Sequence, residues 1–439
     1  MSTYNSGIVN VGTPGAAASG YHTRRLFNFS DRVADLAPDE SPFFVYLSKV
    51  AKVPTDDPQF RFLEDRTKIS MTDRSFLIKG EETIPAAGSS LTYNVDSGGA
   101  SVDWLIKGMV FVIGQEASNV SDPVIVRIES NPIDTGNDDT SFIGKTISGA
   151  DAGGNVAGAK CTVIGTSFSE GSGSPDVFSE ELDNDFGYTQ IFKTACEMSN
   201  TARATRYRGY EDEFQRIWNL KLREHKVDIE RAMLFGQRAS VGGIQYSEGI
   251  AGHILANATA KTGTDDLVYT AGAPYFRSAT TAQLTYDRIL SDFEVVYDPA
   301  RGGSDSKLAL ASLPVITFFN KLGSTSFIDQ SIGNELRYNI EKQEGSFGHT
   351  VLQVETIHGT MNLVKEPLFR GFSAGFLCMV DMDNVAYRPL VGNGVNRDTQ
   401  IMTNVQSADE DLRKDMIMTE AGLEVSLPES HMLIQLQGV

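Results

Sequence analysis

Cysteine and long apolar runs are both scarce in this chain of 439 residues. The three cysteines, Cys161, Cys196 and Cys378, lie far apart and form no Cys-x-x-Cys pair. This spacing disfavours a zinc site or a disulfide framework, so we expect reduced thiols. No run of about 18 apolar residues occurs, so we expect no transmembrane helix. The start, Met1–Asn5, lacks the basic and apolar regions of a signal peptide, which favours synthesis and folding in a cytoplasm.

Positive charge is also in short supply. The chain has 38 Lys and Arg residues against 57 Asp and Glu residues, for a formal net charge of −19. Binding to nucleic acid requires Lys and Arg to neutralise phosphates, so we expect no specific nucleic-acid binding. The same charge disfavours adhesion to anionic membranes. Hydrophobic residues make up 41% of the chain, enough for a sizeable core, and the length indicates two or three structural units.

One pentapeptide, Gly371–Gly375, matches the G-x-S-x-G pattern of serine hydrolases. Asp381 and His431 follow it in the order acid then base. The hydrolase turn needs a strand before the serine and a helix after it. Here a strand, Phe376–Val380, is predicted to follow, so the pattern favours a turn between strands. A serine hydrolase is kept as an alternative.

Metal and nucleotide motifs are incomplete. Residues 381–384 (Asp-Met-Asp-Asn) cluster oxygen ligands but lack the glycine and further acids of a calcium loop, which favours an acidic turn. Residues 223–225 (Arg-Glu-His) contain no H-E-x-x-H, and no P-loop or G-x-G-x-x-G occurs. We therefore expect no catalytic, cofactor-binding or metal-binding residues, and no enzyme.

The first 66 residues have the character of an arm. Residues 1–20 are rich in Gly, Ala and Ser, which indicates mobility. Four large apolar residues then fall within five positions: Phe43, Phe44, Tyr46 and Leu47. An arm cannot bury them against itself, and burying each is worth ~1.5–3 kcal/mol. We expect them to dock on their own subunit's long helix or on a neighbour, and our hypothesis is inter-subunit docking.

A glycine-rich zone, 98–173, contains short β-like runs separated by turn signals. The runs are Met109–Ile113, Val124–Ile128 and Cys161–Ile164. This pattern predicts a small β-rich domain inserted into a longer hairpin, with a long disordered loop as the alternative.

A long amphipathic helix is predicted over 207–238. Its apolar residues recur close to every 3.6 positions, at Tyr210, Phe214, Ile217, Trp218, Leu222, Ile229, Ala232 and Met233. Charges at i,i+4, such as Lys226 and Glu230, are predicted on the opposite, solvated face. Helices Leu284–Tyr297 and from Ser312, with a strand Lys307–Ala311 between them, are followed by a strand-rich end.

The order of these parts resembles the tailed-bacteriophage major capsid proteins, whose HK97-type shell fold is shared with encapsulins. Pro38 to Phe43 is similar to the P-x-x-x-P-F start of the arm in one branch of that family. Glu230–Gly236 resembles the end of its spine helix. Val354–Gly359 and Asp381–Pro389 resemble strands of its peripheral domain.

The resemblance implies an α+β shell fold with an N-terminal arm, an extended β-hairpin loop, a long spine helix, an α/β axial domain and a small inserted β-domain. The implied division is arm 1–66, extended loop 67–97 and 174–190, inserted domain 98–173, peripheral domain 191–283 and 346–439 with spine helix 207–238, and axial domain 284–345.

The implied function is a major capsid protein that self-assembles, as hexamers and pentamers, into the icosahedral head shell around phage genomic DNA. An encapsulin-type compartment is the alternative that shares the fold. The implied partners are further copies of the chain, a portal protein, a decoration protein and, since the arm is short, a separate scaffolding protein. The implied location is the virion, after synthesis in the bacterial host cytoplasm. Some members cross-link a Lys to an Asn, but no motif places such residues here.

Overall fold

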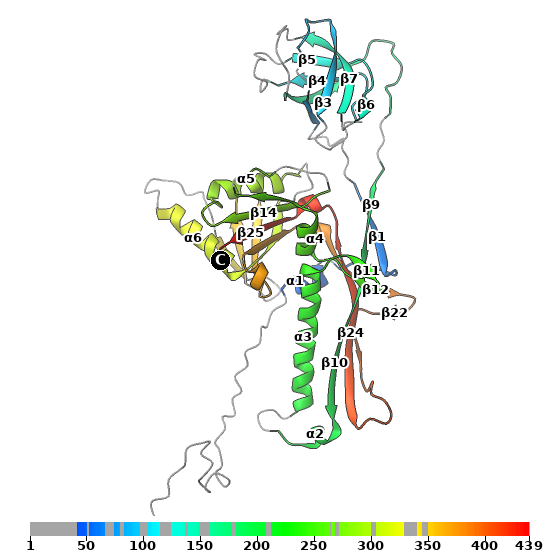
Figure 1. Cartoon of the computed structure of the whole chain (residues 1–439), viewed down its shortest axis with the longest axis vertical. Helices are drawn as coiled ribbons and strands as arrows, with labels where there is room; N and C mark the ends of the chain where they lie inside the picture. The colour runs from blue at the N-terminus through cyan, green and yellow to red at the C-terminus, as the bar shows by residue number, and fades with distance from the viewer. Residues whose placement is uncertain are drawn as a thin grey trace, which may run out of the picture.

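The computed structural model describes most of the chain after the first 41 residues. The described residues are 42–50, 52–65, 74–79, 83–96, 104–114, 124–136, 139–148, 158–177, 181–207, 212–263, 265–267, 272–299, 304–328, 340–344 and 350–438. The predicted mobile segment 1–20 and Pro38 lie outside these ranges. The described part is elongated: a long helix lies beside long strands, an α/β unit adjoins them, and a β unit stands at one end (Figure 1). No helix among the described residues is long and apolar enough to cross a membrane.

The longest helix, α3 (Glu213–Phe235), runs without interruption. Asp212 caps its start, because the carboxylate accepts hydrogen bonds from backbone N–H groups of the first turn. The helix therefore begins later than the predicted span 207–238, of which residues 208–211 lie outside the described ranges. It ends at Gly236, whose N–H donates to the carbonyl of Ala232 at 2.8 Å.

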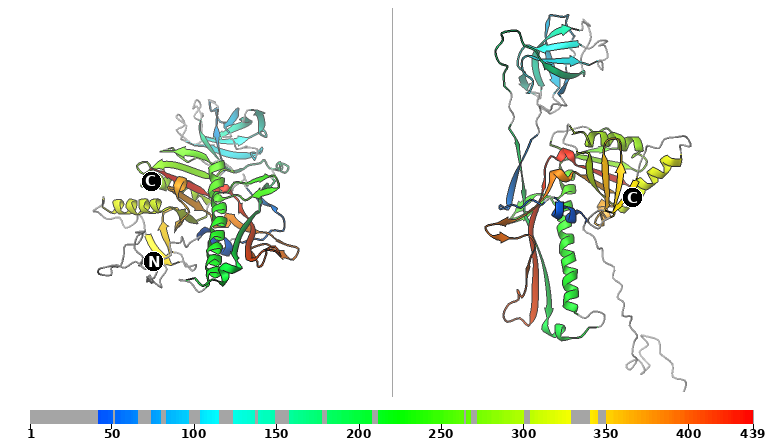
Figure 2. Two further views of the ribbon diagram at one scale, coloured as in Figure 1. Left: turned by 60° about the horizontal axis from the view of Figure 1, so that its bottom comes forward. Right: turned by 180° about the vertical axis from the view of Figure 1, so that it is seen from behind.

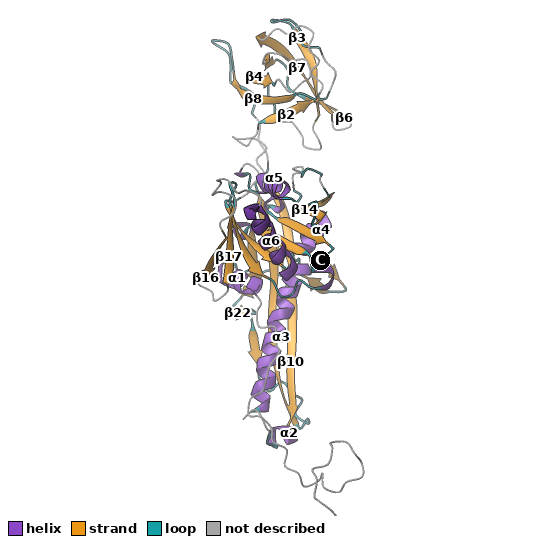
Figure 3. Cartoon of the chain, turned by 90° about the vertical axis from the view of Figure 1, so that its left-hand side faces the viewer, coloured by secondary structure: helices purple, strands orange, loops and turns teal. Residues whose placement is uncertain are grey.

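A four-stranded antiparallel sheet lies along this helix (Figure 3). Its two longest members, β10 (Gln190–Ser199) and β24 (Leu412–Val425), pair over ten residues. β20 (Val385–Pro389) and β23 (Gln400–Met402) also pair with β24. The helix and this sheet form one rigid rod, because buried residues of α3 and of β10, β20 and β24 share one hydrophobic cluster.

The α/β unit is built on an eight-stranded mixed sheet. Its order is β13 (Thr259–Thr262), β14 (Tyr275–Thr280), β25 (Met432–Gln437), β19 (Phe376–Val380), β15 (Ser306–Ala311), β18 (Thr360–Lys365), β17 (Thr350–Glu355) and β16 (Ile340–Glu344). Helices α5 (Tyr286–Val296) and α6 (Leu313–Ile328) pack on one face. Helices α4 (Ile250–Asn257) and α3 contribute to the cluster on the other face.

Alternation along the central strands explains why this sheet is covered on both faces. In β15, Leu308 and Leu310 belong to the cluster shared with α3, whereas Ala309 and Ala311 belong to the cluster shared with α5 and α6. All five residues of β19 are buried. A strand covered on both faces has a continuous apolar sequence, as β19 does.

The predicted axial domain, 284–345, therefore contains too few residues. The eight-stranded sheet, called the axial sheet below, also includes β13, β14, β17, β18, β19 and β25, which the division gave to the peripheral domain. The strand-rich end is divided between two sheets, because β20, β23 and β24 pair with β10 instead. Apolar runs show that a strand is buried but not which distant strand it pairs with.

The β unit at the end of the molecule contains seven strands: β2 (Ser75–Ile78), β3 (Ser90–Asp96), β4 (Met109–Ile113), β5 (Val124–Ile128), β6 (Ile133–Gly136), β7 (Asp139–Ser148) and β8 (Lys160–Thr166). β3 pairs with both β2 and β7, so the path β3-β2-β8-β4-β5-β7 closes on itself as a small barrel.

This barrel has its own hydrophobic core, drawn only from residues 76–163. Phe76, Tyr93, Phe111 and Phe142 are buried in it, and in five of their six pairs the ring centroids lie 5.1–6.0 Å apart. The unit begins near Ser75 and not at residue 98, because β2 and β3 complete the barrel. The sequence division had placed both strands in the extended loop.

A two-stranded ladder of β1 (Gln59–Glu64) and β9 (Asp183–Tyr188) runs from the main body toward the barrel (Figure 2). Residues 59–64 therefore belong to the extended hairpin, although the division gave them to the arm. The shorter elements are α1 (Pro42–Val50), α2 (Asn200–Ala204), hairpins β11 (Ala239–Val241)/β12 (Ile244–Tyr246) and β21 (Val391–Gly392)/β22 (Val395–Asn396), and 3₁₀ turns η3 (Gly371–Ser373), η4 (Met382–Asn384) and η5 (Pro428–Ser430).

Candidate assembly elements and candidate catalytic motif

Helix α1 anchors the arm to the body of its own chain. Phe43 and Leu47 have no exposed surface and lie in the same cluster as Ile229, Met233 and Leu234 of α3. Phe44 packs edge-on against Tyr387 of β20, with ring centroids 5.6 Å apart. Helix α3 and strand β20 thus hold the first described residues of the chain.

The segment after α1 extends this attachment as a short parallel pairing with β20. The N–H of Val53 donates to the carbonyl of Tyr387 at 2.9 Å, and the N–H of Thr55 donates to that of Pro389 at 2.9 Å. Lys52 and Asp398 form an ion pair beside it. The arm is therefore fixed to its own subunit from residue 42 onward.

This attachment limits the inter-subunit hypothesis for the apolar cluster. Phe43 and Leu47 are buried within their own chain, so these two side chains offer no surface to a neighbour. Phe44 and Tyr46 are half-buried against the same core. Their docking on a neighbour stays a prediction, and the residues before Pro42 lie outside the described ranges.

The base of the extended hairpin is braced by stacked side chains. Arg238 donates to Asp185 Oδ1 at 2.6 Å, and its guanidinium lies 4.4 Å from the centroid of the Phe186 ring. Glu64 accepts a hydrogen bond from the N–H of Leu427 at 2.8 Å. A Cβ at Gly187 would overlap the ring of Phe60, so glycine permits the close approach of the two strands. The hairpin therefore leaves the body in a defined direction.

His225 of the Arg-Glu-His triplet links the helix to the sheet. Its Nδ1 lies 2.9 Å from Thr194 Oγ1 on β10, and its Nε2 lies 2.9 Å from Thr419 Oγ1 on β24. Burial lowers the pKa of His225, so the neutral ring is favoured. Both ring nitrogens are committed to threonine hydroxyls, which explains the residue as a structural connector.

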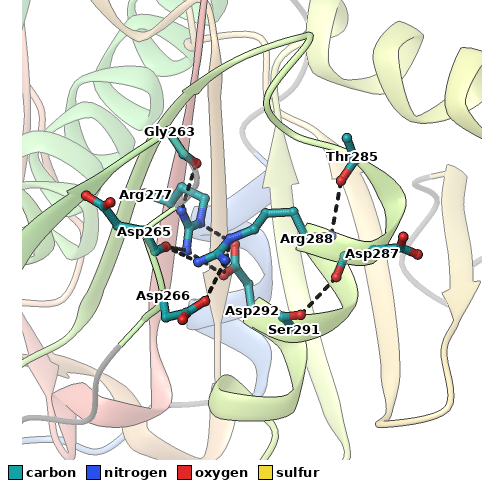
Figure 4. A network of polar contacts seen from close by, with 9 residues as sticks. All are labelled: Gly263, Asp265, Asp266, Arg277, Thr285, Asp287, Arg288, Ser291 and Asp292. Carbon is teal, nitrogen blue, oxygen red and sulfur yellow. Dashed lines mark hydrogen bonds and ion pairs between the residues drawn. The ribbon is translucent and has the colours of Figure 1, made fainter.

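A buried ion pair ties α5 to the axial sheet. Arg277 of β14 donates to Asp292 of α5, with Nη2 2.6 Å from Oδ1, and it also donates to the carbonyls of Gly263 and Asp265 (Figure 4). Arg288 approaches the same carboxylate at 3.5 Å. Burial raises the pKa of Asp292, and the two guanidinium groups oppose that shift. The network fixes the position of α5 on the sheet.

Asp381, the acid of the candidate hydrolase motif, forms an ion pair with a buried lysine. Lys307 Nζ donates to Asp381 Oδ2 at 3.2 Å and to the carbonyl of Ser430 at 2.9 Å. His431 Nδ1 accepts a hydrogen bond from the backbone N–H of Asp381 at 3.2 Å. Burial, with the charge of Lys307, lowers the pKa of His431 to about 3, so its ring is neutral.

Ser373 is not placed to use this pair. It lies before β19, whereas Asp381 follows β19 and His431 precedes β25, so the length of β19 separates the serine from both. Its hydroxyl is buried and donates to the carbonyl of Arg370 at 3.0 Å. A strand follows the serine where the hydrolase turn requires a helix. The geometry contradicts the serine hydrolase alternative.

The three cysteines are free and buried, and burial raises the pKa of Cys378 to about 12. Within the described ranges, no group of three or more His, Cys, Asp and Glu side chains is arranged to hold a metal ion.

The sequence pattern missed one buried group, Glu230, which the helical wheel placed on the solvated face beside Lys226. It has no exposed surface, and its Oε1 accepts a hydrogen bond from the N–H of Phe43 at 2.9 Å. The start of α1 occupies this side of α3, so the face that an isolated helix would expose is covered. Nothing local in the sequence signals that contact.

Comparison with known proteins gives one match over nearly the whole chain. The profile of the family described as SU10 major capsid protein matches residues 7–437. A search of curated proteins found no match. Among solved structures, the chain is similar to one of Mycobacterium phage Bobi (9% identity, TM-score 0.44, covering 95% of this chain and 97% of that one) and to a Cyanophage A-1(L) capsid (11%, 0.44, 93% and 96%). A holo-SrpI encapsulin complex from Synechococcus elongatus is also similar (11%, 0.37, 58% and 77%).

Proposed function

The chain belongs to the SU10 major capsid protein family, and we propose that its subunits close an icosahedral head by overlapping their arms and extended hairpins around a rigid body. The protein is a capsid shell protein of a bacteriophage virion, with the α+β, HK97-type shell fold. The family match over residues 7–437 carries this conclusion.

The described architecture supports different roles for the packed body and for the parts that extend away from it. The α3 rod and the axial sheet share a continuous core, and the buried Arg277–Asp292 ion pair fixes α5 to the sheet. The β1–β9 ladder carries the barrel away from that core. We assign the body to the shell wall, and the ladder and the residues before Pro42 to contacts with neighbouring subunits. Each contact is repeated by symmetry, so modest interfaces close a shell.

Family membership supports proposals about the assembly units and the partner proteins. We propose that the chain assembles with itself as hexamers and pentamers, and that its partners are a scaffolding protein that guides closure, a portal protein at one vertex and a decoration protein on the outside. We also propose that the subunits are made in the host cytoplasm, that they catalyse no reaction, and that the net charge of −19 keeps the inner wall from retaining the packaged DNA.

Electron microscopy of purified particles tests the proposal. The chain is expressed alone and together with the phage's scaffolding protein, and particles are separated by sedimentation. We expect closed icosahedral shells of uniform size, formed in higher yield with the scaffold. Soluble monomers under both conditions would contradict it, and shells that retain cargo proteins but assemble without any phage partner would favour an encapsulin-type compartment.

A further inference from the structure

Backbone N–H groups in the first turn of α1 donate to a carboxylate that belongs to a different helix, α3. The N–H of Phe43 donates to Glu230 Oε1, and the N–H of Phe44 also interacts with this carboxylate. Helix α1 has no acidic residue in its own first turn. A negative group near a helix N-terminus is stabilising because it satisfies free N–H groups and the helix dipole. Glu230 therefore serves as the cap of α1, supplied by α3.

A second buried carboxyl, that of Glu366, meets Glu230 from the residue after β18. The exposed fractions of the two residues are 0% for Glu230 and 2% for Glu366. Glu366 Oε1 accepts a hydrogen bond from the N–H of Leu368 at 3.1 Å. The remaining oxygens, both Oε2, have no hydrogen-bond donor among the described residues, and the two carboxyls lie close enough for each to shift the pKa of the other. Two neighbouring carboxyl oxygens can hydrogen-bond to each other only through a shared proton.

Among the residues that the structure describes, no cation is paired with the two acids. Within the described ranges, neither carboxyl forms an ion pair with Lys, Arg or His. The charged groups on the surrounding elements include Lys49 on α1, Lys226 on α3, Lys365 on β18 and Arg370 beyond it, all exposed. Others are already paired: Asp228 with Arg231 on α3 at 3.3 Å, His253 with Glu248 at α4 at 2.8 Å, and Arg388 on β20 with Glu424. Tyr46 on α1 is a half-buried phenol.

We propose that Glu230 and Glu366 form a proton-dependent latch, in which a proton held between the two carboxyls keeps α1, and with it the arm, docked on α3. The latch joins three parts of the subunit: the arm through Phe43, the spine helix through Glu230 and the axial sheet through Glu366. Loss of the proton leaves two negative charges in one apolar site, and release of α1 admits water to them. The latch concerns contacts within one chain and is independent of shell assembly.

The direction of the pH effect follows from the folded state. Burial, then the neighbouring acid, raises the pKa of Glu230, and burial raises that of Glu366 to about 7. Both values lie above those of exposed glutamates, so the docked form binds more protons than the undocked form. Docking is strongest in acid, below the ordinary glutamate pKa, and weakens as the pH rises through neutrality and beyond.

Hydrogen exchange on the full-length chain measures this docking directly. Protection factors are corrected for the intrinsic, base-catalysed rise of amide exchange with pH. They are compared for the amides of 46–50 in α1 and for those of α5, which serve as an internal reference. Between about pH 6 and about pH 9 we expect the protection of α1 to fall by about tenfold or more relative to α5. The fall reports release of α1 and not general unfolding.

Two variants replace the titrating proton with an amide hydrogen. In Glu366→Gln and in Glu230→Gln, an amide N–H donates to the remaining carboxylate and cannot be lost as the pH rises. We expect the fall in α1 protection over this range to be smaller in both variants than in the wild type, because only one titrating carboxyl remains. Glu355→Gln, at an exposed position of β17, is the matched control and should retain the wild-type slope. Protection of α3 and α5 at about pH 6 checks that each variant folds.

Two results would overturn the latch. One is a flat wild-type profile for α1 across the range, and the other is a wild-type slope in both Gln variants. The first would mean that the acids do not govern docking, and the second that another group does.

Discussion

An ion pair between Arg277 and Asp292 lies almost entirely out of contact with water, with exposed side-chain fractions of 0% and 1%. Replacing Arg277 with Met removes the bidentate partner and two backbone contacts but leaves the carboxylate buried. Breaking a buried pair in this way costs about 3–5 kcal/mol, and we expect the lower end because Arg288 stays near Asp292. Urea unfolding gives the free energy.

The control for this variant is Arg231→Ala, which removes a solvent-exposed partner of Asp228. Exposed pairs contribute little, so its unfolding free energy should match that of the wild type. The double variant Arg277→Met/Asp292→Leu should recover much of the loss, because the buried carboxylate that lost its bidentate partner is removed as well. Equal stability of Arg277→Met and wild type would show that the pair does not hold α5 to the sheet.

Ser373 provides a second test at this scale. Its hydroxyl donates to a backbone carbonyl, and replacement with Ala should cost about 1 kcal/mol or less of stability. Hydrolysis of a p-nitrophenyl ester should proceed at the buffer rate with both the wild-type and the Ser373→Ala protein. Wild-type hydrolysis above buffer that disappears in the variant would restore a nucleophilic role for this serine.

At the scale of elements, the junction between α3 and α4 depends on glycine. A Cβ at Gly236 would clash with the carbonyl oxygens of Ala232 and Ser247, and Gly249 and Gly252 pack against the same backbone. Gly236→Ala should therefore destabilise the chain by about 1–3 kcal/mol through forced backbone shifts. Gly173→Ala, where the added Cβ meets nothing, is the control. Thermal unfolding of the two variants should differ, and identical midpoints would count against the close approach.

The elements were largely predictable from local pattern, and their pairing was not. The 3.6-residue period indicated α3, and apolar runs indicated β4, β5 and β19, because burial of one or both faces selects those sequences. The start of α3 depended on the cap at Asp212, which the periodicity alone passes over.

Long-range partners account for the remaining differences. β25, at the end of the chain, lies between β14 and β19, and Glu230 meets Phe43 across 187 positions. Such contacts are set by the packing of whole elements and leave no periodic signal. For the same reason the sequence singled out Phe43 and Leu47 as residues that must be buried, but not the surface that buries them.

At the scale of the molecule, the separate core of the barrel predicts that it is removable. The ladder partners Glu64 and Asp183 face each other directly, so a two-residue Asn-Gly turn can replace residues 65–182. The shortened chain should keep the α3 rod and the axial sheet, because their cores contain no barrel residue. Circular dichroism and exchange protection of α3 and α5 test this, and loss of protection in α3 would show that the barrel supports the body.

Two variants of the arm distinguish its effect on folding from its effect on assembly. Deleting residues 1–28 removes a segment with little apolar content and leaves α1 intact. We expect this chain to fold with wild-type stability but to form few closed shells when expressed with the scaffolding protein. Replacing Phe43 and Phe44 with Ser should impair both properties, since truncating a buried Phe costs about 3–5 kcal/mol and the anchor on α3 is lost.

Sedimentation of shells, read together with urea unfolding of the subunits, separates the two effects. A folded deletion variant that fails to assemble assigns the first residues to contacts between subunits, because nothing in the described body requires them for its core. A normal yield of closed shells from the same variant would show that the arm before residue 29 is dispensable, and would leave the ladder and barrel as the parts that reach a neighbour.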